Sequence, residues 1–453
     1  MRLDWADLGA PQADAADGRL VEFVGWPATA LPADEATYFL LTPEPMCCQG
    51  CLPGNPLACV EVHAPASVDL RNGALRLRGR WRVLTDDPLG WRYQLVDARL
   101  IGGLKRRNVL MAGALLCAAT PAPAFAQAPA RPAVAGRPAI DMHSHAGSIL
   151  YVNKDNGNAP FTPVAEPMRQ GGMAVICLAV VSDSPTSRIE EGRIRPFRTP
   201  KPGELYSHTQ RAFARLHALV QQQGLGIIKD TAGLRAATSV SPSVIVSSEG
   251  GDFLEGQVDR SDEARERWSL RHLQLTHYRP NELGDIQTEP SVNDGLTATG
   301  VEAIRRCNRL GIVVDVAHGT YELVKKAVAA TTKPLVLSHT SLTERPVAWT
   351  RRITPDHARA IASTNGVIGI WPPSAYFRDI AALADGIAHM ADIVGPSHVG
   401  LGTDMMGLVG PSTFDSYALL PWLADALRRR FNADETADIL GGNYQRVFEA
   451  SLG

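Results

Sequence analysis

Histidine and acidic side chains stand at the carboxyl ends of six predicted strands that are far apart in the 453-residue chain. They are His143, His145, Glu249, His277, His318, His339 and Asp404. His143 and His145 are two residues apart, so on a strand both side chains point to the same side and can bind one metal ion. A mixture of imidazole and carboxylate ligands suits zinc. The pattern therefore predicts a metal centre with hydrolytic chemistry.

Glu249 can extend this centre to two metal ions. Its two oxygens can bridge ions about 3.5 Å apart, with His318 and His339 as ligands of the second ion. A water that bridges two dications becomes hydroxide near neutral pH, because the metals lower its pKa to about 7, and Asp404 can accept its proton. A single histidine at a strand end is usually a core or capping residue, but six strand ends of this kind are improbable as accidents.

Eight nearly continuous apolar runs are expected to form the strands that position these residues. They cover residues 139–145, 174–181, 243–249, 273–277, 313–318, 335–339, 367–371 and 399–404, and a ninth run, 227–229, is expected to be accessory. Helical patterns lie between them, at 204–223, 300–310, 321–330, 355–364 and 380–394. These units predict an α/β fold, a (β/α)8 barrel of the TIM type, whose strands all open onto one catalytic face. A doubly wound open sheet is the alternative, but no G-x-G-x-x-G follows any strand.

Composition predicts three parts in the chain: residues 1–103, 104–138 and 139–453, the last being the barrel. The first part predicts a small β-rich, OB-like barrel, because it has short strand-like runs at 20–24, 37–41, 59–63, 74–84 and 93–100, separated by turn residues. It also holds a cluster of Cys47, Cys48, Cys51, Cys59 and His63. The C-x-x-C spacing of Cys48 and Cys51 suits a metal or redox pair, and Cys59 and His63 can complete four ligands; disulfides or free thiols are the alternative.

The middle part has the order of an export signal. Lys105, Arg106 and Arg107 precede an apolar run over 109–119, and an A-x-A site follows at 124–126. This order is typical of a twin-arginine signal peptide, and the alternative is an Ala/Pro-rich linker. The protein is therefore expected in the periplasm if the signal is used and in the cytoplasm otherwise. Export signals normally lie at the amino terminus. The position of this one inside the chain suggests that two reading frames have been joined, that the true start lies near Leu104, or that the signal is a relic inside a fusion.

Charge and hydropathy argue against nucleic-acid binding and against a membrane-spanning segment. Lys and Arg total 45 against 47 Asp and Glu, a net charge of −2, so no bulk positive field is available to hold nucleic acid. No run of about 18 apolar residues predicts a transmembrane span.

Eight stretches of the barrel segment carry a combined signature: IDMHSH, SSEGG, LQLTHYRPNELGD, GLTATGVEAIRRCNRLGIVVDVAH, PLVLSHTSL, RITPDHARAIASTNGVIGI, HVGLGTD and GGNYQRVF. Together they resemble the membrane dipeptidase family, also called renal dipeptidase, over about residues 139–449. The resemblance implies an amidohydrolase-like barrel that hydrolyses dipeptides with two zinc ions. By motif, the ligands would be His143, His145, Glu249, His318 and His339, with Glu249 shared between the ions.

The same resemblance implies roles for three further residues. Asp404 would be the catalytic aspartate, His277 would contact the tetrahedral intermediate, and Arg352 would pair with the terminal carboxylate of the dipeptide. Hydroxide between the metals would attack the carbonyl, while Asp404 carries the proton to the leaving amine. Arg351 next to Arg352 leaves the choice of arginine open.

The sequence departs from the family pattern at His145, where an Asp is usual, and at Met406, which replaces an acid. His145 in place of Asp makes the centre one negative charge poorer, so a weaker hold on the second ion or a different metal is expected, while Met406 removes an acid near the mouth of the barrel. Residues 186–239 match poorly and are expected to shape the substrate pocket. The alternatives are another binuclear hydrolase, such as a lactonase or phosphotriesterase, and an inactive metal-binding module. A homodimer is a further expectation.

Overall fold

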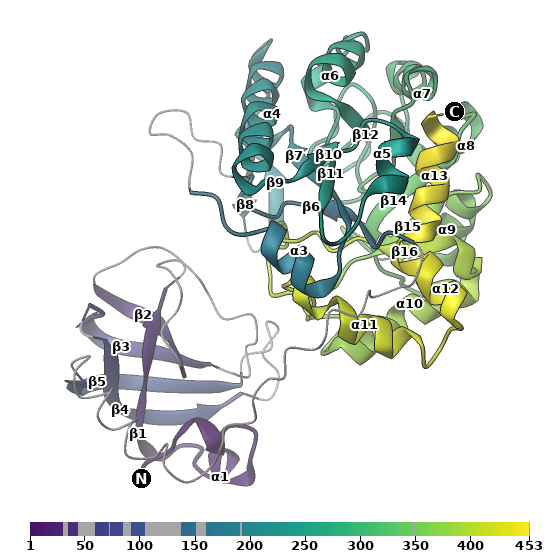
Figure 1. Ribbon diagram of the computed structural model, residues 1–453. Coiled ribbons are helices and arrows are strands. Elements are labelled where there is room, and N and C mark those ends of the chain that lie inside the picture. Colours follow the sequence, from purple (N-terminus) through teal and green to yellow (C-terminus); the bar gives the residue numbers. More distant parts are fainter. Residues whose placement is uncertain are drawn as a thin grey trace. The chain divides into compact units, whose positions relative to one another are not determined.

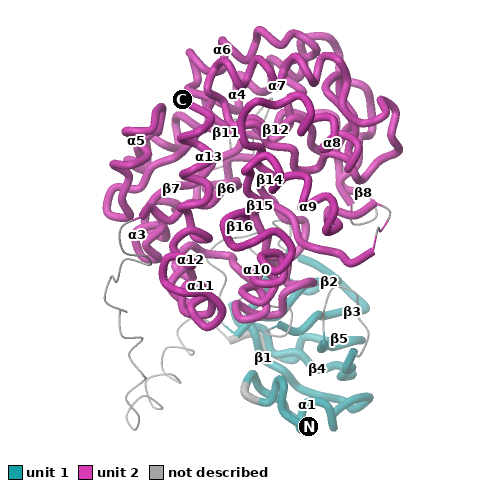
Figure 2. The backbone as a smooth tube through the Cα atoms, turned by 90° about the vertical axis from the view of Figure 1, so that its right-hand side faces the viewer, with its two compact units in different colours: residues 1–128 teal, residues 129–453 magenta. Residues whose placement is uncertain are grey.

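The computed structural model describes residues 1–29, 35–43, 59–71, 73–84, 92–104, 137–150, 160–190, 193–345, 347 and 349–452. The chain divides into two compact units, residues 1–128 and 129–453 (Figures 1 and 2). The signal-like segment, Cys47, Cys48 and Cys51 lie outside the described residues, so export and a cysteine metal site stay predictions. None of the described helices combines the length and apolar character that a bilayer crossing requires.

The amino-terminal unit contains a closed barrel of five strands. The strands are β1 (Leu20–Ala28), β2 (Glu35–Thr42), β3 (Val60–Asp69), β4 (Ala74–Val83) and β5 (Tyr93–Leu104), in the order β1-β2-β3-β5-β4. The barrel closes through antiparallel pairing of β1 with β4, and β3 and β5 run parallel. Its core stacks Trp81 between Phe23 and Tyr93, with ring centroids 5.4 Å apart in both pairs. The predicted small β-barrel is confirmed. A short helix, α1 (Pro11–Asp14), precedes it.

The second unit is built on a parallel eight-stranded sheet that is nearly closed into a barrel. Its strands are β6 (Ile140–Ser144), β7 (Val175–Val181), β11 (Ser243–Glu249), β12 (Leu270–Gln274), β13 (Val313–Asp315), β14 (Leu335–Thr340), β15 (Val367–Ile370) and β16 (Val399–Leu401). They follow each other in chain order around the sheet. The seam between β6 and β16 is bridged just beyond β16, where the amide of His145 donates to the carbonyl of Met405 at 2.8 Å. The predicted barrel is confirmed, and the accessory run forms β10 (Gly226–Ile227) beside β11.

Helices follow the strands and cover the outside of the sheet (Figure 1). They are α3 (Ala165–Gly171), α4 (Glu204–Gln223), α5 (Thr231–Ala236), α6 (Arg260–Trp268), α7 (Ala298–Leu310), α8 (Tyr321–Ala330), α9 (Pro355–Ala362), α10 (Ile380–Val394), α11 (Leu420–Leu427), α12 (Ala433–Ala437) and α13 (Asn443–Leu452). Side chains at helix starts cap several of them: Thr297 before α7 and Thr320 before α8 accept backbone N–H bonds. A hairpin of β8 (Ser187–Glu190) and β9 (Arg193–Pro196) lies between β7 and α4.

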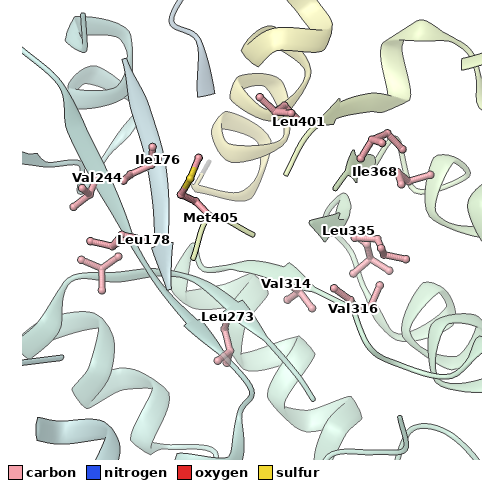
Figure 3. Packing of buried hydrophobic residues seen from close by; sticks show 14 of the residues in the cluster. Ile176, Leu178, Val244, Leu273, Val314, Val316, Leu335, Ile368, Leu401 and Met405 are labelled. Atoms are coloured by element: carbon pink, nitrogen blue, oxygen red, sulfur yellow. The ribbon is translucent and has the colours of Figure 1, made fainter. Parts of the chain in front are cut away.

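Alternate residues of each strand enter different cores because successive side chains point to opposite faces. On β7, Ile176 and Leu178 join the large cluster that includes the helices (Figure 3), whereas Val175 and Cys177 join a smaller cluster with Tyr444 of α13. All of these side chains are buried. The strands are therefore apolar on both faces, as the continuous runs predicted.

The fourth strand differs from its prediction. It spans Leu270–Gln274 rather than 273–277. His272 interrupts the apolar run in the sequence, yet it is fully buried, with Nδ1 2.8 Å from the Tyr444 hydroxyl and Nε2 3.2 Å from Asp315. The prediction placed the start of the strand too late because His272, a polar residue whose ring nitrogens both have hydrogen-bond partners, lies inside the strand. His277 consequently lies three residues beyond the strand, in a loop.

Candidate metal centre

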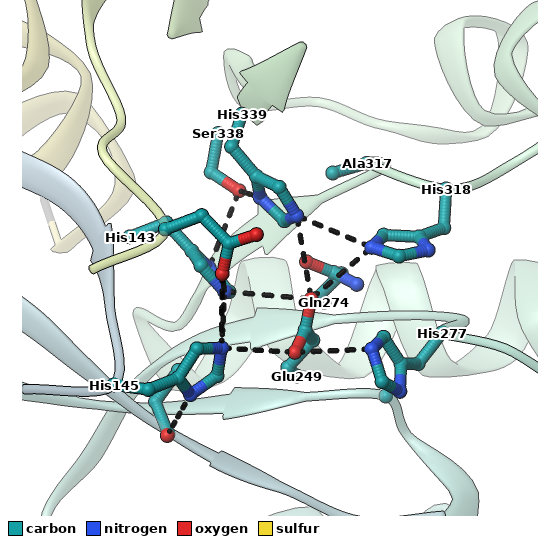
Figure 4. Close-up of polar contacts among 12 residues, drawn as sticks. His143, His145, Glu249, Gln274, His277, Ala317, His318, Ser338 and His339 are labelled. Carbon is teal, nitrogen blue, oxygen red and sulfur yellow. Dashed lines mark hydrogen bonds and ion pairs between the residues drawn. The ribbon is translucent and has the colours of Figure 1, made fainter. Parts of the chain in front are cut away.

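Glu249, the last residue of β11, lies in the middle of a ring of histidines (Figure 4). Its Oε2 is 3.1 Å from His145 Nε2 and 3.2 Å from His277 Nε2. Its Oε1 is 3.1 Å from His318 Nε2 and 3.3 Å from His339 Nε2. His143 Nε2 is 3.4 Å from Oε1 as well, so the two oxygens of one carboxylate are in reach of all five imidazoles.

The ligand-type atoms form three overlapping groups in the described part of the chain. They are His143, His145 and Glu249; Glu249, His318 and His339; and His143, His339 and Asp404. Within each group the atoms lie within 4.8 Å of one another. The structure thus brings together the residues that the sequence predicted as two ligand sets, and Glu249 is common to the first two groups.

The imidazoles fit a cation chemically. His145 Nδ1 is 2.8 Å from the carbonyl of Ala179, which can only accept, so Nδ1 carries a proton and Nε2 is the ring nitrogen that could bind a metal. Nε2 atoms of His143 and His145 are 3.1 Å apart, and those of His318 and His339 are 3.2 Å apart. Such close pairs of ring nitrogens, next to carboxylates, match a shared bound cation.

The charges of the cluster agree with this fit. Burial raises the pKa of Glu249, but His277 and His143 outweigh it and hold that pKa well below its usual value. Burial lowers the pKa of His145, but hydrogen bonds to Asp404 and Glu249 raise it to about 10. The same carboxylates that favour a proton on His145 favour a dication in its place. Burial lowers the pKa of His339 to about 4, which leaves that imidazole neutral.

Two residues of the cluster have left-handed backbone conformations. His318 has φ 66° and Asp404 has φ 50°. A non-glycine residue at such φ costs about 1 kcal/mol or more, and strain of this kind concentrates at functional sites. Gly402 lets the turn that carries Asp404 lie close to the backbone of β14, since a Cβ at residue 402 would be 1.7 Å from the carbonyl oxygen of Ser338. Both strained residues follow short strands whose hydrogen bonds end before them.

Asp315, at the end of β13, ties two strand tips together. Its Oδ1 accepts the backbone N–H of Ala317 at 2.9 Å and of Ser338 at 3.1 Å. These two residues come directly before the histidines of the second ligand set. Oδ2 is 3.2 Å from His272 Nε2, and this hydrogen bond lowers the pKa of Asp315 despite the effect of burial.

Asp141, within β6, likewise ties two strand tips together, on the other side of the barrel. Its Oδ1 accepts the backbone N–H of His143 at 3.2 Å and of Thr403 at 2.8 Å. Oδ2 accepts the hydroxyls of Thr403 at 2.6 Å and Tyr417 at 2.8 Å. Asp404 follows Thr403, so one buried carboxylate fixes a metal-ligand candidate together with the candidate catalytic acid.

The sequence model of the membrane dipeptidase family, peptidase family M19, matches residues 140–451. The chain belongs to the membrane dipeptidase family. A curated relative, dipeptidase verJ of Clonostachys rogersoniana, is 28% identical over 195 residues, which are 41% of this chain and 49% of that protein. The chain spans about half the length of the curated relatives that it matches.

Solved structures agree on the fold. The dipeptidase AC of family M19 has a TM-score of 0.58 and 19% identity, and the match covers 70% of this chain and 99% of that chain. A metallopeptidase from Rhodobacter sphaeroides, liganded with a phosphinate mimic of the dipeptide L-Ala-D-Ala, has a TM-score of 0.56 and 18% identity, with coverage of 70% and 99%. The barrel of these structures is thus also the fold of residues 129–453 of this chain.

Sequence reasoning missed Asp183 in this dipeptidase-family site. Its Oδ1 accepts from His277 Nδ1 at 2.6 Å, and its Oδ2 accepts the backbone N–H of Tyr278 at 3.0 Å. Asp183 is fully buried and lies two residues beyond β7. The rule that polar residues follow strand ends would have found it, but β7 was one of the two strands to which no such residue was assigned.

The two neighbouring arginines differ in their surroundings. Arg351 is buried and its Nη2 donates to the carbonyl of His339 at 3.3 Å. Arg352 is half-buried, and its guanidinium carbon lies 5.0 Å from the ring centroid of Tyr376. Both arginines have buried nitrogens without a hydrogen-bond partner among the described residues, namely Nε and Nη1 of Arg351 and Nε of Arg352. Arg351 therefore contacts the cluster, whereas Arg352 is the more accessible of the two.

The described residues of the amino-terminal cysteine cluster lie at β3. Cys59 directly precedes this strand and is buried, and burial raises its thiol pKa to about 12. His63 lies within β3, and its ring is 5.0 Å from that of Tyr38.

Proposed function

We propose that this protein is a metal-dependent dipeptidase that hydrolyses the peptide bond of dipeptides with two zinc ions. One observation carries the proposal: Glu249 is shared by two imidazole sets in a barrel of the membrane dipeptidase family. His143 and His145 would hold one ion with Glu249, and His318 and His339 would hold the other. The relatives named as dipeptidases, and the related structure with a bound dipeptide mimic, support the substrate class.

When bound, the two dications lower the pKa of a water to about 7 and polarise the scissile carbonyl. Asp404 then acts as the proton carrier of this chain. Burial raises its pKa, but without metal the hydrogen bond from His145 outweighs that effect and keeps the carboxylate ionised. The positive charge of bound ions would favour the ionised form in the same way. Its Oδ1 lies 3.4 Å from His145 Nε2, so it borders the metal cluster and would be placed to pass a proton to the leaving amine.

His277 and Arg352 would bind the substrate. His277 Nδ1 is held by Asp183, and its Nε2 points at Glu249, which aims the ring at the carbonyl oxygen during attack. Arg352 is accessible and would pair with the free carboxylate, which restricts substrates to short peptides. Arg351 is buried behind His339 and would support that ligand instead.

The test compares metal-stripped and zinc-loaded protein on a panel of dipeptides and a panel of lactones. Zinc-dependent release of free amino acids is the expected result, with two zinc ions per chain by elemental analysis. Glu249→Gln should lose both zinc and activity. Glu322→Gln, an exposed change on α8, serves as the matched control and should lose neither. Hydrolysis of lactones but not dipeptides would overturn the proposal in favour of another binuclear hydrolase.

A further inference from the structure

A cavity of about 180 Å³ adjoins the metal cluster, and His145, Glu249 and His277 are among the residues that line it. Its wall includes Leu150, Val181 and the hairpin residues Ile189 and Ile194. We infer that this cavity binds the side chain of the amino-terminal residue of the substrate and selects aliphatic side chains. The inference rests on the proposed dipeptidase function and adds the substrate class.

The chemistry of the wall favours an apolar guest. Four aliphatic side chains line it, and the charged groups beside them already have partners. Asp183 accepts from His277 and from a backbone N–H, and Arg188 is paired with Glu190. A charged substrate side chain would find these charged groups of the described wall already paired, and it would lose part of its water shell against the four aliphatic side chains, which is unfavourable.

The size of the cavity sets an upper limit on the guest. An apolar cavity of about 150 Å³ is large enough to bind benzene. A cavity of about 180 Å³ therefore has room for a valine, leucine or isoleucine side chain, and a phenyl ring would fill most of it.

The hairpin wall is fixed in place before substrate arrives. Ile189 and Ile194 are cross-strand partners in the β8–β9 hairpin. Arg193 Nη2 donates to the Thr288 carbonyl at 2.7 Å, and Arg195 Nε donates to Glu289 at 3.0 Å. These bonds tie the hairpin to the loop after β12, so the wall is held in place and can discriminate by shape.

The order of strands decides which substrate residue enters. Arg352 follows β14, and the hairpin follows β7. In the order β16-β15-β14-β13-β12-β11-β7-β6, β14 and β7 are four places apart and thus face each other across the barrel. A dipeptide with its carboxylate at Arg352 and its carbonyl at the metals directs its amino-terminal residue toward β7 and the cavity.

The experiment measures kcat/KM of the zinc-loaded full chain on two series, X-Ala and Ala-X, where X is Gly, Ala, Val, Leu, Phe, Glu or Lys. In the X-Ala series kcat/KM should rise at least about tenfold from Gly to Leu and fall for Glu and Lys, because each methylene in an apolar pocket changes specificity about tenfold or more. The Ala-X series should vary less. A flat X-Ala series, a best substrate with Glu or Lys, or selectivity that follows only the second residue would overturn the inference. Hydrolysis of neither series would overturn the proposed function as well.

Variants locate the effect in the cavity. Ile194→Trp fills it and should lower the ratio of Leu-Ala to Gly-Ala kcat/KM at least about tenfold. Ile194→Ala enlarges it and should move the optimum to Phe-Ala, which keeps the inference testable if the larger residue disturbs folding. Val240→Trp, at a residue that is 82% exposed and outside the cavity, is the control and should leave the ratio unchanged. An unchanged ratio in both Ile194 variants would refute the inference.

Discussion

Replacement of Asp315 by Asn should weaken the second metal site without unfolding the barrel. The carboxylate accepts two backbone N–H groups, from Ala317 and Ser338, and both directly precede the histidines of that site. Asn keeps the volume and one oxygen, and its amide can donate to the ring of His272 after a change of tautomer. The perturbation therefore removes a charge and leaves the shape.

The magnitude follows from the two hydrogen bonds. The pKa of Asp315 is lowered, so it is ionised at neutral pH, and bonds to a charged acceptor contribute about 1.5–3 kcal/mol against 0.5–1.5 for neutral pairs. The loss is about 1 kcal/mol for each bond and about 2 kcal/mol in total, which corresponds to roughly 30-fold in affinity. Loss of groups that orient metal ligands commonly costs 10–100-fold, which agrees.

The assay is competition between the protein and a chromophoric zinc chelator, which resolves a tight and a weak ion. Asp315→Asn should weaken one ion by roughly 30-fold and leave the other within about twofold. Asp141→Asn is the matched variant, because Asp141 orients His143 and the turn that carries Asp404 on the opposite side. It should weaken the other ion. If both variants bind two zinc ions as the wild type does, or if each weakens both ions equally, the assignment of one carboxylate to each site is wrong.

Three further outcomes are expected. Asp404→Asn should lower kcat by about 10²–10⁴-fold with unchanged zinc content, and an undiminished kcat would remove its role as proton carrier. Arg352→Ala should raise KM for dipeptides while zinc affinity stays constant, whereas Arg351→Ala should lower zinc affinity through His339; the reverse pattern would exchange the two roles. Burial lowers the pKa of His357 to about 4 from 6.5. Between these values the unfolded chain binds a proton that the folded chain does not, so the free energy of unfolding should fall by about 3 kcal/mol as pH drops from 6.5 to 4. In His357→Phe, chemical denaturation at pH 7 and pH 4.5 should show this part of the pH dependence removed; an unchanged pH dependence would contradict it.

Much of the barrel was predictable because its signals are local. Continuous apolar runs predicted the strands, and three helices, α4, α8 and α10, have the bounds expected from sequence. Strand four was misplaced because buried His272 looks like an exposed polar residue until Tyr444 and Asp315 are seen beside it.

The residue types themselves determined the chemistry of the centre: strand-end histidines and a carboxylate, in a known family order, predicted a metal site before any coordinates. Only the tertiary structure decided which side chains meet. Asp183 is 94 residues from His277 in the chain and Asp141 is 262 residues from Thr403, yet each pair is in hydrogen-bond contact. Sequence spacing carries no information on such contacts, because closing the barrel brings strand ends together whatever the length of chain between them. The same closure forms the cavity beside Glu249, whose walls come from segments that no local pattern connects.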